Sequence, residues 1–265
     1  HGDEQQDPEI EHEWLDLWHG ELHDAAEAEF LQQHPCAGEE NVRAIIDRFR
    51  ESRAVNLMQQ VGRERLETLM PRLLKEVWQQ DNSAETLSRI TPLLEAVLRR
   101  TAYLVLLSEN PQALHQLVRL CAASSWVAEY ITRTPLLLDE LLIPETLFRL
   151  PDSAELKEEL HLRLLRIEAD DLEQQMEQLR QYVRAHKLRA AACEVMGKLT
   201  LMQVSDYLTR LAETTLDMVT HLAFEQMVAK YGYPTNTDKE AIYSTEFLIV
   251  GYGKAGGLEV SYSSE

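Results

Sequence analysis

Glycine and proline are scarce in this sequence, with 10 glycines and 9 prolines among 265 residues. Turn-rich β architectures use more of both, so their scarcity favours long helices and argues against an all-β fold. A chain of this length buries a substantial core, as one large domain or as two smaller ones.

The N-terminal part lacks positive charge, because the first Lys or Arg of the chain is Arg43. Thirteen carboxylates lie between Asp3 and Glu40. The whole chain carries a formal net charge of -19. A polyanion repels phosphate backbones and anionic lipid, so nucleic acid and membrane surfaces are excluded as main partners. A basic patch on a protein partner fits better, although such a run is more often a solvated, partly disordered arm.

Cysteines and long apolar runs are also few. Cys36, Cys121 and Cys193 lie far apart in an odd count, which predicts neither a disulfide framework nor a zinc site and indicates a reducing compartment. No apolar run approaches the roughly 18 residues that span a bilayer, and the N-terminus lacks the pattern of a signal peptide. We therefore expect a cytoplasmic protein without membrane contacts.

Helical spacing of apolar residues predicts an irregular multi-helix bundle over most of the chain. One amphipathic helix is expected over about 10–31, with Trp14 and Trp18 on its apolar side as a docking stripe for a partner or as core. A long buried helix is expected over 87–107.

Two more long helices are predicted after residue 167. Asp170 or Asp171 is expected to cap the first, whose inner stripe includes Leu172 and Cys193. The second runs over about 204–231, with apolar residues as far as Met227 directed inward, and ends at a glycine and a proline as helices often do.

The spacing of apolar residues changes from a helical pattern to a continuous run near the C-terminus. Residues 247–250 form a short apolar run that predicts a buried strand, and a glycine-rich loop follows it directly. Backbone amides of such a loop approach an anion closely, and its lysine adds a cation for phosphate. The loop is no P-loop, because the GKS or GKT ending is missing.

The longer string resembles a known enzyme family. The loop reads GYGKAGGLE over 251–259, and an aromatic residue, Ser263, Ser264 and Glu265 close it. This is similar to the entry of polymerase β-type nucleotidyltransferase domains, and more narrowly to the glutamine synthetase adenylyltransferase and adenylyl-removing family, which carries GYGKLGGxELGYSSDLDL there. Segments such as 86–90, 120–124, 134–142, 204–208 and 227–232 also resemble that family, most weakly before about Asn41.

The resemblance implies a mainly α fold that ends in the first strand and loop of a nucleotidyltransferase domain. It divides the chain into an acidic helical regulatory region (1–80), a helical bundle (81–240) and the start of the transferase domain (241–265). The family's two-headed enzymes transfer AMP from ATP to a tyrosine of glutamine synthetase and remove it by phosphorolysis, and the PII signalling protein and glutamine act through the helical region.

The family's functional residues carry over to the C-terminal segment. At the position of the family's first catalytic, Mg²⁺-binding Asp, this chain has Glu265. Where the family has Leu in the loop, it has Ala255. The longer Glu side chain displaces its carboxylate and the second acid is not in the sequence, so we expect no catalysis by these 265 residues alone. The residues implied to bind nucleotide are Gly251, Gly253, Lys254, Gly256, Gly257, Ser263 and Ser264.

Two alternatives stay open. In the first, the chain is a non-catalytic helical module that binds PII, rather than a piece of the transferase site. The second concerns a dense basic segment that contains Arg180, Arg184, Lys187 and Arg189. This segment faces a nucleotide or an acidic partner, or it pairs with nearby carboxylates, as surface charges more often do.

Overall fold

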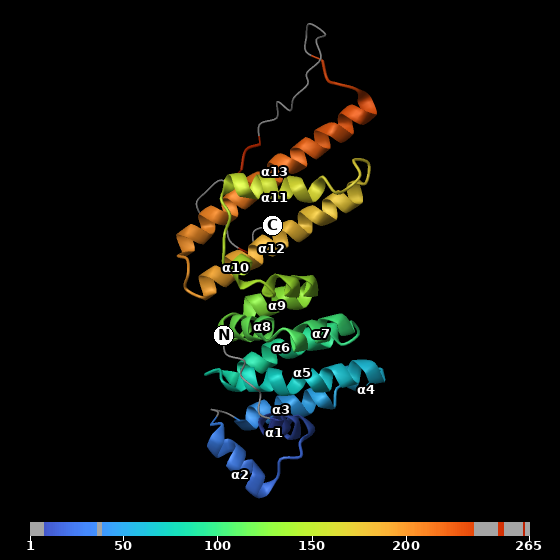
Figure 1. Cartoon of the computed structure of the whole chain (residues 1–265). Helices are drawn as coiled ribbons and strands as arrows, with labels where there is room; N and C mark the ends of the chain where they lie inside the picture. Colours follow the sequence, from blue (N-terminus) through green and yellow to red (C-terminus); the bar gives the residue numbers. More distant parts are fainter. Residues whose placement is uncertain (1–7, 36–38, 236–248, 252–261, 263–265) are drawn as a thin grey trace. The chain divides into compact units, whose positions relative to one another are not determined.

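The computed structural model describes residues 8–35, 39–235, 249–251 and 262. Its regular structure is almost entirely helical (Figure 1), which confirms the mainly α prediction. The chain divides into two compact units, His1–Leu147 and Phe148–Glu265. The functional boundaries expected after residues 80 and 240 stay predictions.

The first unit consists of short and medium helices that follow one another closely along the chain (Figure 1). Its described helices are α1 (Pro8–His19), α2 (Asp24–Gln33), α3 (Glu39–Arg50), α4 (Arg53–Asn56), α5 (Gln60–Trp78), α6 (Ser83–Val97), α7 (Thr101–Glu109), α8 (Pro111–Ala123), α9 (Ser125–Arg133), the 3-10 helix η1 (Pro135–Leu141) and α10 (Pro144–Leu147).

The core of this unit forms around α5 and α6. Helix α5 packs on α1, α7 and α8, and α6 packs on α3, α8 and α9. Leu74 and Val77 of α5, and Ile90 and Leu94 of α6, are fully buried. The single helix expected over 87–107 is wrong, because α6 ends at Val97 and α7 starts at Thr101. Apolar residues lie on nearly every face of this stretch, and no glycine or proline marks the turn between the two helices. The spacing of apolar residues therefore does not reveal that turn.

The helix expected over 10–31 is also two helices. Gly20 between them has a φ of +73°, which glycine adopts without the steric cost that a Cβ brings. Trp14 and Trp18 are 2% and 3% exposed. They therefore belong to the core, and the reading as a docking stripe for a partner is excluded.

The second unit contains α11 (Ser153–Leu164), α12 (Leu172–Val195) and α13 (Leu201–Tyr231), each in contact with the other two. Capping boxes of Asp152 with Glu155 and of Thr200 with Gln203 start α11 and α13. Asp171 caps α12 by accepting a hydrogen bond from the Gln174 amide, as the sequence predicts. The inward stripe predicted for α13 holds in part: Val219 and Leu222 pack against the core, whereas Leu216 and Met227 are about half exposed.

The buried strand is not observed in the described residues. Ile249 and Val250 have irregular backbone and are 52% and 56% exposed. Residues 247 and 248 lie outside the described residues. A strand needs a neighbour to pair with, and the described part of the chain contains no other strand that would bury these side chains.

Within the described residues, no helix combines the length and apolar character needed to cross a bilayer.

Candidate functional site

The structure describes little of the predicted nucleotide loop itself. Gly251 is described and exposed. The other residues assigned to nucleotide and metal lie outside the described residues, and their roles stay predictions: Gly253, Lys254, Gly256, Gly257, Ser263, Ser264 and Glu265. Tyr262, which precedes Ser263 directly, is described and shows where this segment meets the helices.

Tyr262 is anchored on α12 at both its backbone and its side chain. The ammonium group of Lys187 donates to the Tyr262 carbonyl over 3.3 Å. The Tyr262 hydroxyl donates to the carboxylate of Glu194. The half-buried ring packs against the apolar core of the second unit. Burial, the hydrogen bond to Glu194 and the charge of that carboxylate raise the pKa of the phenol, so it stays a neutral donor.

Helix geometry explains why Lys187 and Glu194 act together. Residues seven positions apart are two turns apart and share one helix face. The face that carries them meets Tyr262. Other residues of the same stretch, His186 and Arg189, are buried in the core. Helix α12 therefore contacts Tyr262 and the core of its unit at once.

The second unit also contains a buried polar centre between its helices, here called the Glu159 centre: Glu159, His186, Arg189 and Tyr207. Nδ1 of His186 lies 2.5 Å from the Tyr207 hydroxyl, and its Nε2 lies 3.4 Å from the Glu159 carboxylate. Arg163 donates to Glu159 over 2.8 Å, and Arg189 approaches the same carboxylate to 3.8 Å. The centre joins α11, α12 and α13.

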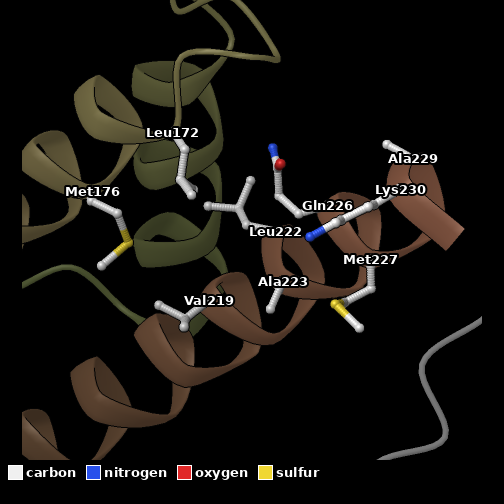
Figure 2. Close-up of a pocket in the computed structure, with 9 residues that line it drawn as sticks. All are labelled: Leu172, Met176, Val219, Leu222, Ala223, Gln226, Met227, Ala229 and Lys230. Carbon is white, nitrogen blue, oxygen red and sulfur yellow. The ribbon is translucent and has the colours of Figure 1, made fainter.

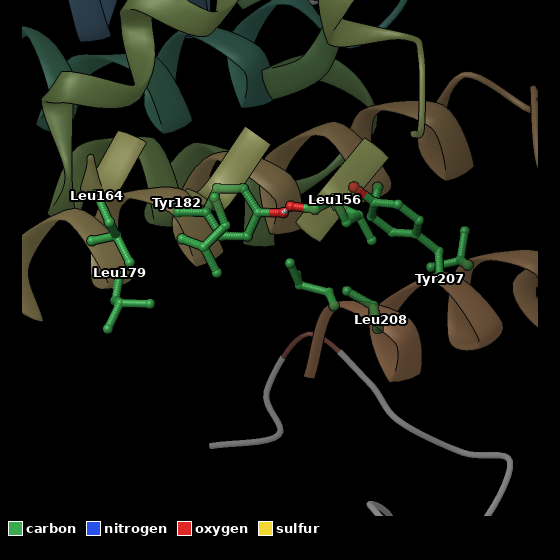
Figure 3. Packing of buried hydrophobic residues seen from close by; sticks show 10 residues of the cluster. Leu156, Leu164, Leu179, Tyr182, Tyr207 and Leu208 are labelled. Atoms are coloured by element: carbon green, nitrogen blue, oxygen red, sulfur yellow. Dashed lines mark hydrogen bonds between the residues drawn. The ribbon is translucent and has the colours of Figure 1, made fainter. Parts of the chain in front are cut away.

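The same three helices share an apolar core that includes Tyr207. Figure 3 shows Tyr182 and Tyr207 among Leu156, Leu164, Leu179 and Leu208. The Tyr182 hydroxyl donates to the Leu156 carbonyl over 2.9 Å, which satisfies its polar end.

The charges of the centre are set by their surroundings. Burial alone would raise the pKa of Glu159, but the hydrogen bond with His186 and the charges of His186, Arg189 and Arg163 lower it to about 2. Burial lowers the pKa of His186 and favours the neutral ring. Glu159 is thus a carboxylate that pairs with Arg163 and faces the buried Arg189, and the centre links the three helices.

The basic segment of α12 finds partners within the chain. Arg180 pairs with Glu177 at 3.5 Å, and Arg189 and Lys187 make the contacts given above. The charge of Arg184 helps to lower the pKa of Glu177, after hydrogen bonds from Gln181 and Arg180 that do the same. Contacts within the chain therefore account for the charges of Arg180, Lys187 and Arg189.

A groove of about 610 Å³ lies between the start of α12 and the second half of α13 (Figure 2). Leu172, Met176, Val219 and Leu222 line it, and Figure 2 shows Lys230 at its edge. Such a lining suits apolar surface and not a triphosphate. Among the described residues, no cluster of three or more His, Cys, Asp or Glu side chains is arranged to hold a metal ion.

Sequence reasoning missed Tyr262, Glu194 and the Glu159 centre. In the sequence, residue 262 stands out only as the aromatic position of the family motif. No local sequence pattern connects it to residues 187 and 194, which are far away along the chain. The buried Tyr182, His186 and Arg189 were hidden because helical periodicity assigns polar residues to the outer face.

Comparison with known proteins identifies the family of this chain. An adenylyltransferase family model matches residues 114–265, so the chain belongs to a family of nucleotidyltransferases. That family is Glutamate-ammonia ligase adenylyltransferase.

Curated relatives carry the matching name "Bifunctional glutamine synthetase adenylyltransferase/adenylyl-removing enzyme". The chain is 49% identical over 253 residues to the protein of Pseudomonas putida and 49% identical over 254 residues to that of Pseudomonas syringae pv. tomato. It is 47% identical over 253 residues to the protein of Hahella chejuensis. Each match covers 96% of this chain and 26% of the relative, so the chain spans about a quarter of the length of these relatives. The family resemblance is confirmed.

Proposed function

We propose that the chain is part of a cytoplasmic enzyme that transfers AMP from ATP to a tyrosine of glutamine synthetase and removes it by phosphorolysis. The observation that carries the proposal is the similarity, across 96% of the chain, to an enzyme named as a bifunctional glutamine synthetase adenylyltransferase/adenylyl-removing enzyme. The glycine loop and the Ser-Ser-acid string lie within the part that the family model matches.

In this proposal, residues 247–250 form the first strand of the transferase domain once its other strands are present. The amides of Gly251, Gly253, Gly256 and Gly257, together with Lys254, approach the phosphates of ATP. Ser263 and Ser264 donate hydroxyl hydrogen bonds to the triphosphate.

Glu265 fits Mg²⁺ by its chemistry, because this hard cation prefers carboxylate oxygens. Mg²⁺ would supply charge neutralisation of the triphosphate at the moment of transfer. The role of Glu265 is to hold that ion, and its side chain is one methylene longer than the family's Asp.

The experiment uses the protein at the full length of its relatives, with glutamine synthetase and ATP labelled at the α-phosphate. We expect label on a tyrosine of glutamine synthetase that requires Mg²⁺. Ser264→Ala and Glu265→Gln should lower the rate, Glu265→Asp should retain it, and Ser88→Ala on the exposed face of α6 serves as the control. Absence of label from the α-phosphate, or transfer from the γ-phosphate instead, would contradict the proposal.

A second candidate function is that of a helical interaction module through which PII and glutamine regulate the enzyme. It is favoured because helices make up most of the chain that the structure describes. Titration of this chain with PII, with and without ATP and Mg²⁺, distinguishes the two. Binding of PII without nucleotide binding supports the module, and nucleotide binding without PII binding opposes it.

A further inference from the structure

Another pocket of the second unit lies at the C-terminal end of α13 and is here called the Gln175 pocket. Its volume of about 550 Å³ is that of a small-molecule site. Helix α12 contributes Gln175 to the lining, and α13 contributes Phe224, Glu225 and Ala229. Gly232 ends α13 with a φ of +80°, and the chain turns there so that the next residue also lines the pocket.

Gln175 brings an unsatisfied acceptor to this pocket. The residue is 5% exposed and yet belongs to the lining, so it lies at the pocket floor. Its Nε2 donates to the carbonyls of Glu168 and Ala169 over 3.3 and 3.4 Å. Because carbonyls only accept, these bonds fix the orientation of the amide. Its buried Oε1 is left with no hydrogen-bond partner within the described residues, which indicates that a donor from outside the chain completes it.

The remaining polar groups make the pocket negative. The Glu225 carboxylate lines it and lies 3.3 Å from Nε2 of His221, which lines it too. The C-terminal end of a helix carries negative partial charge, because its last carbonyls have no intrahelical donor. Ala229 is in the last turn of the 31-residue α13. Lys230 of the same turn lines the apolar groove of Figure 2 instead. These groups favour a cationic donor over an anion.

We infer that the Gln175 pocket binds a small organic molecule that carries a primary ammonium group and no carboxylate. The N–H groups of an ammonium match the Gln175 amide oxygen and the Glu225 carboxylate. The rings of Phe224 and Tyr233 offer aromatic surface to the cation and to its apolar part. A carboxylate on the ligand would face Glu225 and the negative helix end. The site is independent of the transfer of AMP.

The test titrates the full-length protein with propylammonium chloride in the absence of ATP and follows binding by ligand-observed NMR. We expect saturable binding and a rise in Tm, because a ligand that binds only the folded state stabilises it. β-Alanine is the matched ligand control, since it has a carboxylate where propylammonium has a methyl group. It should bind about tenfold more weakly or worse, because like charges repel.

Two pairs of variants test the residues. Glu225→Gln removes the anionic acceptor and should weaken propylammonium binding about tenfold, whereas Glu213→Gln makes the same change in net charge at an exposed position of α13 and should not. Gln175→Met removes the buried acceptor and should also weaken binding. Its control is Gln174→Met at the exposed neighbouring position. If Gln175→Met does not fold, the exposed Glu225 decides.

Absence of saturable propylammonium binding would overturn the inference, as would equal affinities for propylammonium and β-alanine. Equal losses in Glu225→Gln and Glu213→Gln would overturn it as well, since they would show that binding follows net charge and not this pocket.

Discussion

The hydroxyl of Tyr207 on α13 lies 2.5 Å from Nδ1 of His186 on α12, and both side chains are fully buried. The other ring nitrogen of His186 faces the Glu159 carboxylate at 3.4 Å. Tyr207 is therefore the hydrogen-bond partner on which this buried imidazole depends.

Tyr207→Phe should lower the free energy of unfolding by about 1–3 kcal/mol, because it leaves a buried polar nitrogen without a partner. Urea denaturation measures the change. Tyr231→Phe is the control on the same helix, since Tyr231 is 68% exposed, and its effect should stay within about 0.5 kcal/mol. Equal effects of the two substitutions would show that the contact with His186 adds no stability.

Acid should weaken the second unit through Glu159. Its pKa is lowered from 4.5 in the unfolded chain to about 2 in the fold. Above pH 4.5 the carboxylate is ionised in both states and its stabilisation is fully present. As pH falls from 4.5 toward 2, the unfolded chain takes up the proton first and that stabilisation is lost.

Glu159→Gln removes this contribution, so it should cost about 2 kcal/mol at pH 7 and progressively less toward pH 3. Denaturant titrations of wild type and variant at both pH values measure the difference. Glu158→Gln, at an exposed neighbouring position, provides the control. A difference for Glu159→Gln that does not change with pH would contradict the assignment of the lowered pKa.

Two tryptophans of the first unit allow a paired test. Nε1 of Trp78 donates to the His34 carbonyl over 2.8 Å, whereas Nε1 of Trp14 is buried without a partner. The two rings meet edge to face at 5.7 Å, so their surroundings are similar.

Trp78→Phe should therefore destabilise the protein by about 1 kcal/mol more than Trp14→Phe, since the loss of ring volume is shared and the loss of a hydrogen bond is not. Chemical denaturation followed by circular dichroism measures both variants. A larger cost for Trp14→Phe would mean that volume, and not the Trp78 hydrogen bond, decides the outcome.

The helices of the fold were largely predictable from the sequence, because apolar spacing and capping residues are local signals. Asp171, for example, caps α12 as expected. The errors have one cause. The turn between Val97 and Thr101, and the exposure of Leu216 and Met227 on α13, depend on how helices pack, which a single helix's pattern does not contain.

The sequence predicted which residues belong to the candidate site, but not which other residues they contact. The family resemblance identified the glycine loop and the serine pair, but the contact of Tyr262 with Glu194 joins residues 68 positions apart. The Glu159 centre depends on three helices meeting, so His186 and Arg189 looked like surface residues in the sequence. Polar groups become buried only when the partners that satisfy them are brought in by the fold.

Two glycines should respond to alanine in opposite directions. Gly197, after α12, has a φ of +66° and open space where a Cβ would be, so Gly197→Ala should cost about 1 kcal/mol from backbone strain alone. Gly62 lies inside α5 without a positive φ, and the nearest atom to an added Cβ is the terminal methyl of Met58 at 3.1 Å. Because that flexible side chain can move, Gly62→Ala should stabilise the protein by about 0.5–1 kcal/mol through helix propensity. Thermal unfolding of the two variants checks the signs. A destabilised Gly62→Ala would show that Met58 is held in place, and the double variant Gly62→Ala with Met58→Ala would then relieve the contact and test that reason.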